Sequence, residues 1–274
     1  MKNWIFSAAL LAGLSIAAAA PALASDRATL SEVRERGEVI CGVNSGLVGF
    51  AAPDATGNWS GFDVALCRAV AAAVLGDPSK VRYIPTTGET RFQVLLNGDV
   101  DLLARNSTWT FSRDAGLGLE FVGINYFDGQ AFMVPRALGV SSAQELDNFA
   151  VCVQTGTTTE QNLADYFRAN NMTYRAVRLD TNAEGEQRYI AGGCDVYTTD
   201  MSALAATRAA FASPDDHIIL PEIISKEPLG PAVRGDDRNW ADIVRWTLNA
   251  LIAAEEQGVT SANIEELARA SQNP

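Results

Sequence analysis

The sequence contains a single histidine, His217, and this scarcity excludes several kinds of active site. A serine nucleophile that relies on a histidine base has no obvious partner, because His217 stands in an acidic turn after Asp215 and Asp216. The chain also lacks a Gly-x-Ser-x-Gly elbow and a phosphate-binding loop that ends in Gly-Lys-Ser or Gly-Lys-Thr. An enzyme that uses only carboxylates stays open, although no spacing singles out an acid and base pair. Its candidates would be Asp63, Glu89, Glu160 and Asp200.

Basic residues are in the minority, with 21 Lys and Arg against 33 Asp and Glu and a net charge of −12. Such a chain repels polyanions, so we expect no nucleic-acid partner. We expect no metal site either, because the four cysteines include no close pair and only one histidine is present. No cofactor is expected, since no cofactor-binding motif is found in the sequence.

Long apolar runs are also scarce, and the one that is present lies at residues 4–20, after the positive charge of Lys2. Ala22-Leu23-Ala24 follows as a small-residue cleavage site. We therefore predict a signal peptide over residues 1–24, a mature chain from Ser25 and a periplasmic location. An uncleaved membrane anchor is the alternative, but the run is slightly short of the about 20 residues that a span needs.

The four cysteines are expected to be paired, because disulfides persist outside the cytoplasm. Three pairings are possible. The organisation of the chain favours Cys41 with Cys67 and Cys152 with Cys194, because each of these pairs closes a loop within one half of the chain. Each loop is expected to contribute about 3 to 4 kcal/mol to the free energy of unfolding.

A short pattern occurs twice and suggests two related halves. In each copy a helix ends at glycine, an aspartate enters a short apolar strand, and a polar loop follows. The strand-entry residues are Asp101 and Asp195, and the fifth residue after each is Asn106 and Asp200. We therefore expect these two side chains at the carboxyl ends of equivalent strands, which is where open α/β sheets bind ligands. Two ordinary helix-to-strand junctions would give the same pattern.

Apolar strands alternate with helical patterns along both halves, which predicts an α/β fold with parallel sheets. The alternation is interrupted near residues 133–138 and restarts at residues 150–153. We place a boundary there, so that residues 25–134 and 227–274 form a discontinuous first lobe and residues 135–226 form the second. The first lobe is discontinuous because the chain returns to it near residue 227.

Three polar sites stand out in the loops. Thr157 and Thr158 follow a glycine turn at a helix start, where amides, hydroxyls and the helix dipole favour an anion; a simple capping box from Thr157 to Glu160 is the alternative. Arg113 has the donor geometry to grip a carboxylate, or it pairs with Asp114 at the surface. Asp200 is placed to bind an ammonium group, or it only caps the helix that begins at Met201. Arg113 and Asp200 together would hold a zwitterion.

Four segments of the sequence resemble the periplasmic solute-binding proteins of polar amino-acid ABC transporters, and among them the general L-amino-acid binding proteins. The segments are residues 61–64, 101–113, 151–160 and 194–200. The resemblance covers nearly all of residues 25–274. It implies the two-lobed type II fold of periplasmic binding proteins, with a mainly parallel sheet in each lobe and a two-stranded hinge.

The resemblance also implies a function, the capture of a broad range of polar L-amino acids for delivery to a membrane permease by a monomeric protein that is not an enzyme. By motif position Arg113 would hold the α-carboxylate, with help from Thr108, Thr157 and Thr158. Asp200 would hold the α-ammonium group, and Asn106 would add a hydrogen bond. The ligand contact expected at the first loop falls on Asn44.

Two departures from the family pattern affect these expectations. Leu47 stands where many relatives place an aromatic residue over the ligand side chain, which leaves the side-chain preference open. Similar proteins continue past a position like Pro274 with a further helical tail, so a truncated or naturally short chain is expected. A dehydratase of a cyclic amino-acid precursor on the same scaffold is the alternative function. The sensing part of a signalling system is a third.

Overall fold

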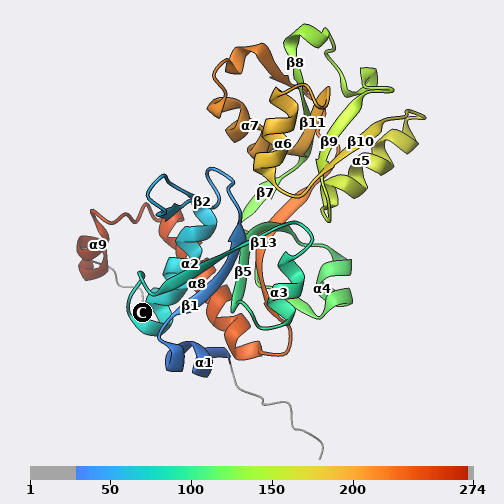
Figure 1. The fold of residues 1–274 in the computed structure, drawn as a ribbon. Coiled ribbons are helices and arrows are strands. Elements are labelled where there is room, and N and C mark those ends of the chain that lie inside the picture. Colours follow the sequence, from blue (N-terminus) through green and yellow to red (C-terminus); the bar gives the residue numbers. More distant parts are fainter. Residues whose placement is uncertain (1–28, 271–274) are drawn as a thin grey trace, which may run out of the picture.

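The computed structural model describes residues 29–270 and arranges them around two β-sheets, each flanked by helices (Figure 1). The signal peptide predicted over residues 1–24 lies outside the described residues. Within residues 29–270, no helix combines the length and the apolar character needed to cross a membrane. The α/β class predicted from the alternating patterns is confirmed.

The first sheet has the strand order β4-β1-β5-β13-β6, and β7 pairs with β13. β1 runs parallel to β4 and β5, whereas β13 runs antiparallel to β5, β6 and β7. The strands are β1 (Val39–Asn44), β4 (Val81–Thr86), β5 (Leu102–Thr108), β6 (Leu119–Phe121), β7 (Tyr126–Asp128) and β13 (Glu227–Arg234). The helices connected to them are α1 (Thr29–Arg36), α2 (Phe62–Leu75), α3 (Arg91–Leu96), α4 (Phe111–Leu117), α8 (Arg238–Glu256) and α9 (Ile264–Ala270). A small ribbon of β2 (Ala52–Pro53) and β3 (Trp59–Ser60) precedes α2.

The second sheet has the strand order β10-β9-β11-β8-β12. β9 runs parallel to β10 and β11, whereas β8 runs antiparallel to β11 and β12. The strands are β8 (Gln130–Pro135), β9 (Ala150–Gln154), β10 (Arg175–Leu179), β11 (Val196–Asp200) and β12 (His217–Ile219). Its helices are α5 (Thr158–Ala169), α6 (Asn182–Ile190) and α7 (Met201–Ala210), and three short 3₁₀ turns complete it at Arg136–Leu138, Ala143–Glu145 and Pro214–Asp216.

Both sheets are mixed, which refines the prediction of mainly parallel sheets. In each sheet three neighbouring strands are parallel. The next strand, β13 in the first sheet and β8 in the second, runs in the opposite direction. The reason is the path of the chain between the sheets. The parallel strands end at the edge that faces the other sheet, so a strand that arrives from the other sheet enters at that edge and runs the opposite way.

The chain crosses between the sheets twice. It leaves through β7 and enters β8 after Gly129, and it returns through residues 220–226 into β13. Asp128 at the end of β7 is paired with Glu227 at the start of β13, so the two crossings lie side by side, as the predicted two-stranded hinge requires. The predicted first lobe, residues 25–134 and 227–274, therefore includes most of β8, a strand of the second sheet.

The central strands are buried on both faces, because helices cover each sheet. All six residues of β1 and all five of β9 are buried. Their sequences are accordingly continuous apolar runs rather than alternating ones, as is typical of parallel strands in α/β proteins. Trp240 of α8 closes the first core, where its indole Nε1 donates to the carbonyl of Asp101 over 2.8 Å.

The repeated sequence pattern corresponds to a repeated structure. β5 lies beside β1 as β11 lies beside β9. The carboxylate of Asp101 accepts the backbone N–H of Ile40 at 2.7 Å, and that of Asp195 accepts the N–H of Ala150 at 2.8 Å. Each aspartate thus satisfies a backbone donor near the start of the neighbouring parallel strand, β1 or β9. The prediction of equivalent strands is confirmed.

Both predicted disulfides are present. Cys41 of β1 is bonded to Cys67 of α2 with the Cα atoms 6.3 Å apart, and Cys152 of β9 is bonded to Cys194, 5.7 Å away, just before β11. The first cysteine of each pair is on the equivalent strand, β1 or β9. Each bond therefore fastens the middle one of three parallel strands to an element that neighbours it in the same half of the fold.

We expect the double variant Cys152→Ser/Cys194→Ser to lose about 4 kcal/mol of unfolding free energy, because the bond closes a loop with a sequence separation of 42 residues. The matched variant Cys41→Ser/Cys67→Ser, with a separation of 26, should lose about half a kcal/mol less. Urea titration followed by circular dichroism measures both. A loss below about 1 kcal/mol in either variant would contradict a stabilising role.

Candidate functional site

A polar cavity lies between the two sheets, at the carboxyl ends of their parallel strands. The centres of water-sized molecules can occupy about 20 Å³ of it, so the lining side chains lie close together. The first sheet contributes residues of β5 and of α3, and the second contributes residues at the ends of β9 and β11 and the first turns of α5 and α6. The cavity is lined by Arg91, Arg105, Asn106, Thr108, Gln154, Thr157, Thr158, Thr159, Asn182, Thr199 and Asp200. This is the position at which α/β sheets bind ligands.

The structure brings together five of the seven predicted ligand contacts at this cavity: Asn106, Thr108, Thr157, Thr158 and Asp200. The other two, Asn44 and Arg113, do not line it. Asn44 is fully buried at the end of β1, where its Nδ2 donates to Oδ1 of Asn106 over 3.0 Å. In this arrangement Asn44 orients a lining residue instead of facing the cavity.

Arg113 lies in the first turn of α4 and is only 8% exposed, so a surface pair with Asp114 is not found. Its Nη1 donates to the carbonyl of Thr108 over 2.8 Å, and its guanidinium lies 5.1 Å from the ring centre of Phe92. Burial lowers the pKa of Arg113 to about 10, against the opposing effect of Glu227 and Asp200. The side chain is therefore bound to the backbone of Thr108 at the end of β5 and is not part of the cavity lining.

Two arginines that the sequence reasoning did not select reach the cavity. Arg105 directly follows the three apolar residues that begin strand β5, and Arg91 begins α3. Both are buried, with exposed fractions of 1% and 3%. A charged residue that directly follows a buried apolar run requires a buried partner. The position of Arg105 after residues 102–104 was therefore visible in the sequence as a possible site residue. Arg91 carried no such signal, because a helix start next to a turn is an ordinary place for an arginine.

Three buried polar atoms at the cavity have no hydrogen-bond partner among the described residues. They are Nε of Arg91, Nη2 of Arg105 and Oδ1 of Asp200. Buried polar groups are nearly always satisfied, so unpartnered ones on residues that line a common cavity indicate what would fill it. Two cationic donors and one carboxylate acceptor are complementary to a molecule that carries both an anionic and a cationic group.

Asp200 has an unusual electrostatic environment. Burial raises its pKa to about 8, and the negative charges of Asp128 and Glu227 act in the same direction, while Arg91 and Arg105 lower it only in part. Its side chain makes no capping hydrogen bond to α7, although the residue occupies the N-cap position. The interpretation of Asp200 as a simple helix cap is therefore not supported.

The pKa values of the arginines are shifted in the opposite direction, toward lower values. Burial lowers the pKa of Arg105 to about 10 and that of Arg91 well below its usual value, and mutual repulsion among the cleft arginines adds to both shifts. Arg91 also reaches across the cleft, where its Nη2 donates to the carbonyl of Gly156 over 3.3 Å. An anion placed between these guanidinium groups would relieve their repulsion.

Asn106 has a strained backbone, with a φ of 31°. The carboxylate of Asp63 at the start of α2 accepts the N–H of Asn106 at 3.0 Å and the side-chain amide of Asn125 at 3.4 Å. Burial raises the pKa of Asp63 to about 6. Left-handed asparagines cluster at functional sites when the surroundings hold them there, and Asp63 supplies this restraint.

The start of α5 matches the capping box that was the simpler interpretation of its sequence. The hydroxyl of Thr157 accepts the N–H of Glu160 at 3.2 Å and donates to the carbonyl of Gln154 over 2.6 Å. Since a hydroxyl has one proton, Thr157 has none left for a ligand in this arrangement. What remains at this helix start is the dipole, which favours an anion in the cavity.

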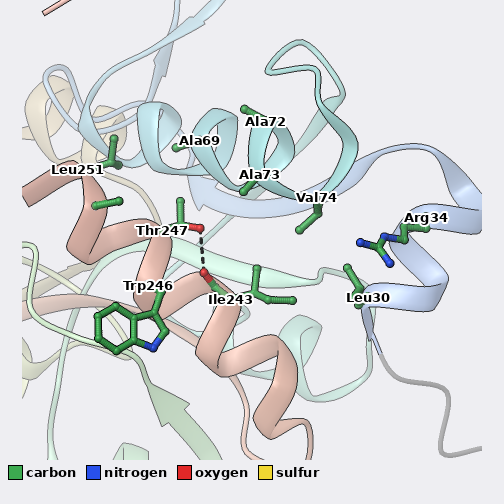
Figure 2. A pocket seen from close by; sticks show the side chains of 11 residues that line it. Leu30, Arg34, Ala69, Ala72, Ala73, Val74, Ile243, Trp246, Thr247 and Leu251 are labelled. Carbon is green, nitrogen blue, oxygen red and sulfur yellow. Dashed lines mark hydrogen bonds between the residues drawn. The ribbon is translucent and has the colours of Figure 1, made fainter. Parts of the chain in front are cut away.

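A larger groove lies far from these charges, between α1, α2 and α8 of the first sheet (Figure 2). Its lining is mostly apolar and includes Leu30, Val74, Ile243 and Trp246, the last with 68% of its surface exposed. None of the unpartnered buried atoms of residues 29–270 lies among its lining residues. The groove is therefore not suited to a charged small molecule. Within the same residues, no cluster of His, Cys, Asp or Glu is arranged to hold a metal ion.

Comparison with known proteins agrees with this geometry. Residues 39–261 match the model of the bacterial extracellular solute-binding proteins, family 3. The glutamate/glutamine/aspartate/asparagine-binding protein BztA of Rhodobacter capsulatus is 62% identical over 273 residues, which are 100% of this chain and 79% of BztA. The general L-amino acid-binding periplasmic protein AapJ of Rhizobium johnstonii is 56% identical, again over 100% of this chain and 79% of the relative.

A solved structure shares both fold and sequence. It is the periplasmic binding protein of an ABC transporter from Brucella ovis with glutathione bound, which is 56% identical, with a TM-score of 0.86 over 90% of this chain and 77% of that one. The fold, the interlobe cavity and the extent of the family match lead to one conclusion: this chain belongs to the bacterial extracellular solute-binding proteins, family 3.

Proposed function

We propose that this chain is the extracytoplasmic substrate-binding component of an ABC transporter, which captures polar L-amino acids between its lobes and delivers them to a membrane permease. The observation that carries the proposal is the set of unpartnered atoms at the cavity, namely the guanidinium nitrogens of Arg91 and Arg105 and the carboxylate oxygen of Asp200. A zwitterion would satisfy both signs at once. The names of BztA and AapJ support amino acids as the ligands.

The proposed roles follow from the charges. Asp200 binds the α-ammonium group, and the α-carboxylate lies toward the arginines, near the start of α5. Arg113 was predicted to bind this carboxylate, and it does so only if its guanidinium turns from the carbonyl of Thr108, to which Nη1 donates here. Arg105 and Arg91 already face the cavity. Asn106, Thr108, Thr157 and Thr158 complete the proposed lining, and Asn44 positions Asn106. The three threonine hydroxyls donate to protein acceptors here, so they offer the ligand only lone pairs in this arrangement.

The proposed lobes follow the two sheets. We place residues 29–128 and 227–270 in the first lobe and residues 130–226 in the second, with Gly129 at the crossing, so that β8 joins the sheet with which it pairs. Only closure of these lobes brings Asp200 and the arginines onto one molecule, so the free energy of ligand binding favours the closed state. The proposed location is the periplasm, after cleavage of a signal peptide before Ser25.

The first test is calorimetric titration of the mature protein, unfolded and refolded to remove bound ligand, with L-amino acids, their D-forms and the corresponding decarboxylated amines. We expect binding of the L-forms and a loss of binding with the amines, because these leave the arginines without an anion. No binding in a folded sample would contradict the proposed function. Recovery of the ligand unchanged separates a binding protein from a dehydratase, which would convert a cyclic amino-acid precursor.

A second experiment compares the arginines through Arg105→Ala and Arg113→Ala. Removal of the guanidinium that binds the carboxylate should cost at least about 2 kcal/mol of binding free energy, since a buried carboxylate is left unpaired. We expect this loss for Arg105→Ala from its position on the cavity, and for Arg113→Ala if the predicted contact forms on binding. Arg82→Gln, at an exposed pair with Glu38, is the control and should bind as the wild type does. Wild-type affinity in both cleft variants would contradict the arginine site.

A third experiment uses the raised pKa of Asp200. In the arrangement described here the carboxyl group is largely protonated below its pKa of about 8, and it must lose this proton to bind an ammonium group. Affinity should therefore rise as the pH is raised from about 6 toward 8 and level off above, with proton release on binding at pH 7. Calorimetry in buffers of different ionisation enthalpy measures both effects. Asp200→Asn should bind weakly and lose this pH dependence; an unchanged pH profile in that variant would assign the titration to another group.

A further inference from the structure

Glu227 lies at the point where the chain returns from the second sheet to the first. It is the first residue of β13, paired with Asp128 across the hinge, and only 2% of its surface is exposed. It is not among the residues that line the cavity. A buried carboxylate that does not face the ligand site needs a different explanation, because removal of such a charge from water is costly.

The carboxylate of Glu227 binds donors from three parts of the molecule. The hydroxyl of Thr108, at the end of β5 in the first sheet, donates to Oε2. The second sheet contributes two donors from α5, the hydroxyl of Thr158 to Oε2 over 2.9 Å and Nδ2 of Asn162 to Oε1 over 2.7 Å. The return segment adds the hydroxyl of Ser225, 2.6 Å from Oε1. One charge thus joins both lobes and the hinge.

The number of available protons defines the direction of these bonds. Thr108 and Thr158 lie 3.2 Å apart across the cleft, and each also contacts Glu227, but the two hydroxyls have only two protons for three contacts. Hydrogen bonds to a charged acceptor are the stronger ones, so both protons go to Glu227. The two threonine oxygens then have only lone pairs to offer the ligand, and Thr108 and Thr158 are joined through the carboxylate rather than directly. This link adds to the bond from Arg91 to Gly156 across the cleft.

We propose that Glu227 is a positioning residue that ties the closed lobes together and so sets how slowly any ligand leaves, without contacting a ligand group itself. This rests on the proposed binding function. In the open state Thr158 and Asn162 move away from Thr108, and water replaces them around the carboxylate. Closure regains charged hydrogen bonds that do not depend on which ligand is bound. The contribution is therefore the same for every ligand.

The test is Glu227→Gln. This substitution replaces one carboxylate oxygen by an amide NH₂ group, which is a donor, so the two donors that contact that oxygen lose their acceptor. We expect Kd to rise by roughly tenfold, through faster dissociation, because bonds to a charged group are lost. The factor should be equal for L-glutamate, L-glutamine and L-alanine, because only the population of the closed state changes. Asn162→Ala, which removes one donor outside the cavity, should produce a smaller uniform rise. Stopped-flow dissociation and calorimetry provide these values.

Glu222→Gln is the matched control, since the carboxylate of Glu222 accepts from Ser142 and the N–H of Ala143 on its own side of the hinge. It should leave Kd unchanged. Factors that differ among ligands would mean that Glu227 acts on the ligand and would overturn the proposal, as would a Kd within twofold of the wild type. If the wild type binds no amino acid, the proposed function fails, and the closed fraction of the ligand-free proteins decides on Glu227. Single-molecule fluorescence energy transfer between labels on the two lobes measures that fraction: a smaller closed fraction in Glu227→Gln supports the tie, and an equal one overturns it.

Discussion

The central constraint on this molecule is the burial of opposite charges between two lobes that are each stable around their own core. Arg91, Arg105 and Asp200 are nearly inaccessible, and each has a polar atom without a partner among the described residues. Buried charges that are not compensated destabilise a protein, so the closed arrangement is costly until a molecule with both signs of charge enters. The same cost makes the cleft selective: a ligand that lacks either charge leaves one group buried and unsatisfied.

The placement of these charges depends on the repeated topology. Each half of the fold places three parallel strands in the same order and ends them at the shared edge. Asp101 and Asp195 hold the entry of β5 and β11 to the neighbouring strand, so Asn106 and Asp200 arrive at facing positions five residues later. β5 and β11 are equivalent strands, but β5 carries the amide of Asn106 and β11 carries the carboxylate of Asp200. The two related lobes therefore present different functional groups to the cleft. Glu227 then joins the two edges from the hinge.

Local sequence was sufficient to predict several features and not others. The continuous apolar runs of β1 and β9, the cysteine pairs and the position of Asp200 depend on patterns within one half of the chain, and these predictions are confirmed. The antiparallel placement of β8 and β13 depends on the path between the sheets, which no local pattern contains. Arg91 was missed for a related reason: it donates to the carbonyl of Gly156 in the opposite lobe, and no local pattern contains that contact. Arg105 could have been selected, because a charge directly after an apolar run needs a buried partner.

The position of β13 has a consequence for the order in which the chain folds. The second sheet uses strands from one continuous stretch, residues 130–219, whereas β13 lies in the interior of the first sheet between β5 and β6. The sheet of the first lobe is therefore incomplete until residues 227–234 pair with β5 and β6. These residues follow the whole second lobe along the chain, and long-range pairing of this kind is slow. We therefore expect the second lobe to complete its contacts first and the cleft to form last, when the strand that begins with Glu227 is inserted.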